Sequence, residues 1–309
     1  MEISSPRGSS IIWFFRDKGF DDKCIKEMFS KCKRLETVQR ERASENWAYL
    51  KSIGIEERKI PSCLGTLGTR PSEVAATITK FPHMLSHSVE EKLCPLLAFF
   101  ESLGVPEKQL GKMFLLNPRL ISYSIETKLG QIVEFLASLG LNEEGMIGKV
   151  LAKSPYIMGY SVDKRLRPTS EFLKSLGLTE LDKQRVAVNF PEVLCRDVEK
   201  ILRPNLAYLK RSGFGDWRIV ASVSGYPPIL IKSIKNSLEP RIRFLVEIMG
   251  RQLDEVAVYP DFFRHALKKR IELRQKLLNQ GKIDCSLSEM LDCNQKKFLL
   301  KFGLMEGLV

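Results

Sequence analysis

Basic side chains recur ten residues after a proline at four places in the chain: Lys92, Lys128, Arg165 and Arg270. Ammonium and guanidinium groups bind phosphate oxygens electrostatically, and a guanidinium can also grip the edge of a guanine base. A row of such groups at one repeated position predicts contact with a nucleic acid. The alternative is that each is only a solvated charge, because helix surfaces are normally charged.

Further basic residues lie beside this position or later in the same segments: Arg167, Lys200, Arg203, Lys235, Arg241, Arg243, Lys268, Lys269 and Arg274. The chain has 49 Lys and Arg against 37 Asp and Glu, a formal charge of +12, and residues 201–280 alone hold 15 basic and seven acidic residues. Such an excess indicates a nucleic acid or another anionic partner. We therefore predict that these nine residues and the four above form the nucleic-acid-binding set.

The sequence contains no pattern that predicts catalysis or a bound metal. It has three histidines, and it lacks a Gly-rich phosphate loop, a nucleophile motif and a convergent set of histidine and carboxylate. His83 and His87 are four residues apart, but Pro82 begins a turn there and no cysteine or acid completes a zinc site. We expect no enzymatic activity, no cofactor and no metal.

The basic positions belong to a repeated pattern that starts at a leading proline. The leading prolines are spaced by 36, 37, 36, 36 and 33 residues: Pro82, Pro118, Pro155, Pro191, Pro227 and Pro260. Apolar residues follow at the second and third places after each proline. Serine or aspartate, both good N-cap residues, follows at the sixth place except in the last copy, which has Ala266. A period of this length is typical of solenoids.

Each repeat is predicted to contain two helices joined by the proline-led turn. Beyond the cap, apolar residues at places seven, eleven and eighteen lie on one helical face, as Val198, Leu202 and Leu209 do. Glycine then ends this second helix. The next leading proline ends the shorter helix that lies between the glycine and that proline. Neither helix can bury its apolar face alone, so repeats must stack. We predict an all-α fold, a curved solenoid of about seven helix-turn-helix repeats of about 36 residues each.

The pattern divides the chain into four segments. Residues 1–15 read as a serine-containing tail or the remnant of a transit peptide, and residues 16–81 as a degenerate repeat with an extra helix between Gly54 and Pro82. Residues 82–281 hold the six proline-led repeats. Residues 282–309 form a C-terminal cap with a helix from Leu287 to Leu300, N-capped by Ser288.

Two further features concern the compartment of the protein. Seven cysteines, an odd number with no CxxC pair, indicate a reducing compartment. No apolar run approaches the roughly 18–20 residues that span a bilayer, so we expect a soluble protein without membrane contact.

The repeated pattern resembles the mitochondrial transcription termination factor (mTERF) family. Its elements are Pro-x followed by two apolar residues, then Ser or Asp, Lys or Arg before Leu, a proline, Phe-Leu and Ser-Leu-Gly, from about Trp47 to Leu300. The last copy, YPDFFRHALKKRIELRQKLLNQG, is similar to the carboxy-terminal signature of that family, although Leu273 stands where the signature usually has proline. The plant branch, which acts in chloroplasts or mitochondria, is the most similar.

The resemblance implies an all-α superhelix whose concave basic face binds double-stranded DNA. For function, it implies termination or regulation of organellar transcription. An alternative within the family is an RNA-binding factor for tRNA or rRNA maturation or intron splicing. A different alternative is a solenoid scaffold that binds only proteins, which the local excess of positive charge disfavours. We expect a monomer with double-stranded DNA as its partner and RNA as the alternative partner.

Overall fold

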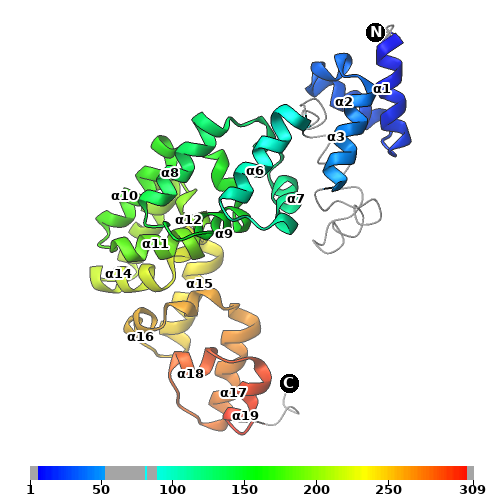
Figure 1. Ribbon diagram of the computed structural model, residues 1–309. Coiled ribbons are helices and arrows are strands. Elements are labelled where there is room, and N and C mark those ends of the chain that lie inside the picture. The colour runs from blue at the N-terminus through cyan, green and yellow to red at the C-terminus, as the bar shows by residue number, and fades with distance from the viewer. Residues whose placement is uncertain (1–5, 53–80, 82–88, 305–309) are drawn as a thin grey trace. The chain divides into compact units, whose positions relative to one another are not determined.

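The computed structural model describes residues 6–52, 81 and 89–304, and all regular elements in these ranges are helical (Figure 1). This confirms the all-α prediction. The chain divides into two compact units, Met1–Val162 and Asp163–Val309. The extra helix predicted between Gly54 and Pro82 lies outside the described residues. Within them, no helix has the length and apolar character that crossing a membrane requires.

The first unit begins with α1 (Pro6–Asp17), α2 (Asp22–Lys31), the short turn η1 (Lys33–Thr37) and α3 (Arg40–Ser52). Phe14 and Phe15 of α1 are buried. The ring of Phe14 packs edge-on against Trp47 at 6.1 Å between centroids, and that of Phe15 against Phe29 at 6.4 Å. The segment that we expected to be a tail is therefore folded from Pro6 onward, because its apolar residues find partners in α2 and α3.

The first helices of the repeats are α7 (Glu107–Leu116), α9 (Met146–Lys153), α11 (Glu180–Asn189), α14 (Asp216–Gly225) and α16 (Leu253–Val258). A proline-led turn follows each of them: η4 (Pro118–Ser122), η6 (Pro155–Gly159), α12 (Pro191–Leu194), η9 (Pro227–Ile231) and η12 (Pro260–Arg264). In these five turns the apolar pair after the proline is buried, from Leu120 and Ile121 to Phe262 and Phe263. The turn is thus fixed by its own apolar residues.

The second helices each open with a π-helical turn and continue as α-helix. In chain order they are η3 (Val89–Leu93) with α6 (Cys94–Ser102), η5 (Ile125–Leu129) with α8 (Gly130–Ser138), η7 (Val162–Leu166) with α10 (Arg167–Ser175), η8 (Val198–Leu202) with α13 (Arg203–Arg211), η10 (Ile234–Leu238) with α15 (Glu239–Arg243) and η11 (Phe244–Ile248), and η13 (Leu267–Glu272) with α17 (Leu273–Gly281). Ser124, Asp197 and Ser233 accept an amide hydrogen bond from three residues ahead, as predicted for N-caps.

The π-helical turn itself was not predicted from the sequence. In the second of these helices the Leu129 amide donates to the Ser124 carbonyl, five residues back, at 3.0 Å. Four repeats have a proline at the thirteenth place, but Gln131 and Leu273 take that place in the other two. Their second helices begin with the same π-helical turn, so the proline is not its cause.

Glycine is required where α9 approaches the end of α6. The Gly148 amide donates to the Leu103 carbonyl at 2.9 Å, and a Cβ atom on Gly148 would lie 2.4 Å from that oxygen. Backbones can meet this closely only without a side chain.

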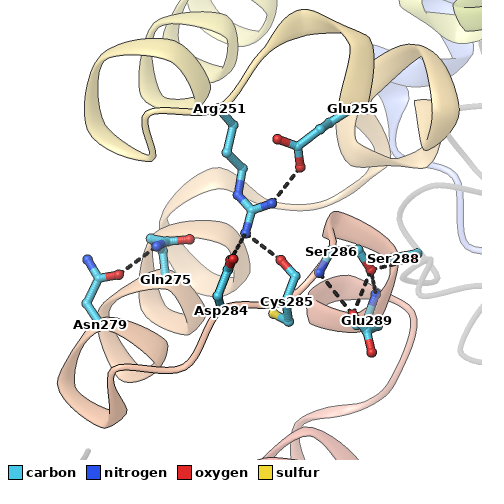
Figure 2. Close-up of polar contacts among 9 residues, drawn as sticks. All are labelled: Arg251, Glu255, Gln275, Asn279, Asp284, Cys285, Ser286, Ser288 and Glu289. Atoms are coloured by element: carbon cyan, nitrogen blue, oxygen red, sulfur yellow. Dashed lines mark hydrogen bonds and ion pairs between the residues drawn. The ribbon is translucent and has the colours of Figure 1, made fainter.

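The C-terminal cap consists of two helices, α18 (Leu287–Leu291) and α19 (Gln295–Lys301), instead of the single helix that we predicted. Ser286, not Ser288, is the N-cap of α18, because Ser286 and Glu289 bond reciprocally to each other's backbone amides (Figure 2). Asn294 caps α19.

Arg251, in the segment between η11 and α16, contacts the loop that leads into this cap. Its side chain is 14% exposed, and it forms an ion pair with Glu255 at 2.5 Å (Figure 2). It also donates to the carbonyl of Cys285 at 2.5 Å. The loop before α18 is therefore held by a side chain that begins in the fifth repeat.

Candidate nucleic-acid interface

A side chain from each of the first five second helices donates a hydrogen bond to the next proline-led turn. In all five described junctions the acceptor is the carbonyl oxygen five residues after the leading proline. The pairs are Lys92 to Tyr123 at 2.7 Å, Lys128 to Tyr160 at 2.5 Å, Thr169 to Arg196 at 3.0 Å, Asn205 to Lys232 at 2.8 Å, and Arg241 to His265 at 2.9 Å. This oxygen lies at the end of the turn, where a partly buried carbonyl needs a donor.

The four basic residues ten places after a proline are all engaged inside the protein. Lys92 and Lys128 are donors of the junctions just described, and burial lowers the pKa of the Lys128 ammonium. Arg165 forms an ion pair with Asp197, the N-cap of the next repeat, at 2.6 Å. Arg270 donates to the carbonyls of Leu291 and Cys293 at 2.7 and 2.6 Å. Their recurrence therefore has a structural cause, the joining of neighbouring repeats.

Arg274 is a buried residue, with 1% of its surface exposed. Its guanidinium donates to the carbonyls of Met290 and Cys293 and lies 4.5 Å from the centroid of the Phe298 ring. The prediction that Arg274 contacts a nucleic acid is wrong for the folded chain, because the C-terminal cap covers it. Burial lowers the pKa of the Arg274 guanidinium, and likewise that of Arg241.

Seven of the predicted residues are exposed, and all of them belong to the second unit: Arg167, Lys200, Arg203, Lys235, Arg243, Lys268 and Lys269. Three of these are arginines in surface ion pairs, Arg167 with Asp163, Arg203 with Glu199, and Arg243 with Glu247. Helix pairs of this kind contribute only about 0.3–0.5 kcal/mol, so a phosphate can compete with the carboxylate.

A groove of about 480 Å³ in the second unit separates two neighbouring second helices. Lys164, Arg165 and Arg203 contribute basic groups to it, and the Arg203 guanidinium lies 5.6 Å from the centroid of the Phe172 ring. Glu171, Asp197 and Glu199 also line the groove. The wall of this groove is therefore of mixed charge, and the exposed Lys235, Lys268 and Lys269 lie outside it.

Sequence reasoning missed Thr169 and Asn205 as structural residues. Both occupy the fourteenth place after the proline and are buried, as Arg274 is, whereas Leu96 and Ile132 occupy that place in the first two repeats. A polar residue on an otherwise apolar helical face was the available signal. Asn205 donates to the carbonyls of both Leu230 and Lys232 at 2.8 Å.

The described residues contain no group of three or more His, Cys, Asp and Glu side chains that could hold a metal ion. His83 and His87 lie outside the described ranges. Burial raises the pKa of the Cys195 thiol to about 12, as for a cysteine that serves as a small apolar side chain in the core.

These features, a helix-turn-helix repeat and basic turns at its second helices, define a class of helical-repeat proteins. The mTERF family model matches residues 64–299, and the chain belongs to this family. Among its relatives is the transcription termination factor MTERF6, chloroplastic/mitochondrial, of Arabidopsis thaliana. The two are 62% identical over 330 aligned positions, which cover 99% of this chain and 98% of the relative. The predicted family and the predicted organellar localisation are thereby confirmed.

Proposed function

We propose that this protein binds double-stranded organellar DNA through its second unit and so terminates or regulates transcription. Two lines of support are membership of the mTERF family and the name of the Arabidopsis relative as a transcription termination factor. The observation that carries the proposal is the set of seven exposed basic side chains in the second unit.

The exposed side chains recur at the start of successive second helices. Arg167 belongs to the third repeat, Lys200 and Arg203 to the fourth, Lys235 to the fifth, and Lys269 to the sixth. Each cation that meets a phosphate releases condensed counterions, which supplies affinity that does not depend on base sequence. The three arginines exchange their carboxylate partners for phosphates or reach base edges in the major groove. The protein acts as a monomer, and this function requires no catalytic group.

The test removes three of these charges together, with Arg203→Ala, Lys235→Ala and Lys269→Ala in the full chain. The matched control removes three exposed lysines from first helices, Lys108, Lys112 and Lys149. Affinity for duplex DNA and for a structured RNA is measured over a range of salt concentrations. If the three residues meet phosphates, the triple variant weakens duplex binding and lowers the slope of log affinity against log salt by about one for each contact, while the control does not.

The two alternatives appear as different outcomes of the same experiment. Loss on structured RNA without loss on duplex DNA favours a factor for tRNA, rRNA or intron maturation. No change on either ligand favours a protein-binding scaffold and refutes the proposal.

A further inference from the structure

A groove lined by aromatic rings lies in the first unit and has a volume of about 440 Å³. Its walls carry the rings of Phe81, Tyr123, Tyr156 and Tyr160 together with Arg119. Sites for small organic molecules commonly measure about 300–1,000 Å³, so a flat heterocycle of nucleobase size fits here.

Two successive proline-led turns, η4 and η6, build this groove. Tyr156 directly follows Pro155 and is 52% exposed, whereas Phe100 and Phe114 of the same unit lie in the core. Tyr123 and Tyr160 each follow the end of their turn. Gly159 lies against Tyr123, since a Cβ atom there would sit 3.4 Å from the tyrosine hydroxyl. Gly159 also lines the groove, and no side chain extends from this position.

Charge distinguishes this groove from the one in the second unit. The Arg119 guanidinium lies 5.5 Å from the centroid of Phe81, and the Lys128 ammonium lies 6.0 Å from that of Tyr123. None of the described residues that line the aromatic groove is acidic. Aromatic faces beside cations, without carboxylates, are complementary to a polymer that carries flat bases and negative phosphates.

We propose that the aromatic groove binds unpaired bases of a single-stranded RNA. Bases within a duplex stack on one another, whereas those of single-stranded RNA can be splayed out to stack on aromatic and arginine side chains. RNA is the single-stranded polymer that transcription produces. The inference goes beyond duplex binding by the second unit, since it uses a different surface and relies on stacking in addition to phosphate contacts.

The test measures binding of the full chain to a fluorescein-labelled 12-nucleotide RNA that cannot pair with itself. Tyr156→Ala should weaken affinity about fivefold or more, the smallest loss expected for one stacked base, and Tyr156→Phe should retain it because the ring remains. The control is Trp217→Ala, which removes an aromatic residue of the second unit that is 56% exposed and also lies beside an arginine. Equal affinity of Tyr156→Ala and the unmodified protein refutes the inference, and so does an equal loss in Tyr156→Phe.

Two further measurements separate this site from the proposed duplex interface. RNA that contains 4-thiouridine should crosslink to peptides that include Tyr123 or Tyr156, and crosslinks confined to the second unit refute the inference. Tyr156→Ala should leave duplex DNA affinity unchanged, whereas an equal loss on duplex DNA refutes a separate RNA site. A DNA strand of the same sequence should bind no more tightly than the RNA, and tighter binding refutes the assignment to RNA.

Discussion

Replacing Arg274 with alanine should loosen the C-terminal cap from the last repeat. The guanidinium donates to the carbonyls of Met290 and Cys293 at 2.7 and 2.8 Å, and only 1% of the surface of Arg274 is exposed. Hydrogen bonds from a charged group contribute about 1.5–3 kcal/mol each, which gives about 3–6 kcal/mol for two. Arg270 also donates to the Cys293 carbonyl, so only the Met290 carbonyl loses its side-chain donor. We therefore expect the lower end of this range, about 3–4 kcal/mol.

Hydrogen exchange read by mass spectrometry tests this prediction, because a repeat array opens locally when a terminal interface is weakened. Amides of α18 and α19 should exchange faster in Arg274→Ala, while those of α13 stay protected. Arg274→Lys should recover little, since an ammonium cannot span two carbonyls as a guanidinium does. Lys276→Ala, an exposed change on the same helix, is the control. Unchanged exchange together with a loss of nucleic-acid affinity would show that Arg274 acts at the surface, and the reasoning would be refuted.

Three further outcomes are expected. Leu202→Ala should lower the free energy of unfolding by about 2–5 kcal/mol in urea titrations, whereas Val258→Ala, at an 83% exposed site, should change it little; similar effects would contradict the assigned core. Gly148→Ala should destabilise by about 1–3 kcal/mol by thermal or urea unfolding, because its Cβ meets the Leu103 carbonyl, and Gly215→Ala, with open space around it, is the control. Burial, with Arg270 and other nearby arginines, lowers the pKa of His265 from 6.5 to about 4. The unfolded chain therefore takes up a proton more readily, and stability should fall as the pH drops from about 6.5 towards 4. The difference between the urea midpoints at pH 7 and pH 5 should be smaller in His265→Gln than in the unmodified protein. An equal difference in both proteins would exclude protonation of His265 as the cause.

Much of the fold could be predicted because its signals are local. A serine or aspartate six places after a proline caps a helix wherever the neighbouring repeat lies, as Ser124 and Asp197 do. The N-cap of α18 also has a local signal, because Glu289 follows Ser286 by three residues and the two form a capping box, which Ser288 cannot form with Leu291. The burial of Phe15 could not be read locally, because its partner Phe29 comes from another helix.

The candidate site was harder to predict because it depends on the direction of long side chains. Lys92 and Lys128 border the apolar face of their helices, and a lysine in that position can reach outward or across to a neighbour. Which of these occurs is decided by the carbonyls of Tyr123 and Tyr160, more than 30 residues further along the chain. The carbonyls that bind Arg274 likewise belong to the C-terminal cap. The repeat pattern ends before this cap and so does not predict the path of its backbone.

The junction between repeats has an asymmetry that bears on how such a chain can grow. The acceptor is always a backbone carbonyl, so it is present whether the residue is Tyr123, Arg196 or His265. The donor varies among lysine, threonine, asparagine and arginine, and it comes from the tenth or the fourteenth place. A segment copied from one leading proline to the next therefore brings its own donor for the repeat after it and an acceptor for the repeat before it. Duplication or deletion of a whole repeat would therefore keep a donor and a carbonyl acceptor at these junctions, while contacts such as the Arg165–Asp197 ion pair depend on the particular neighbour.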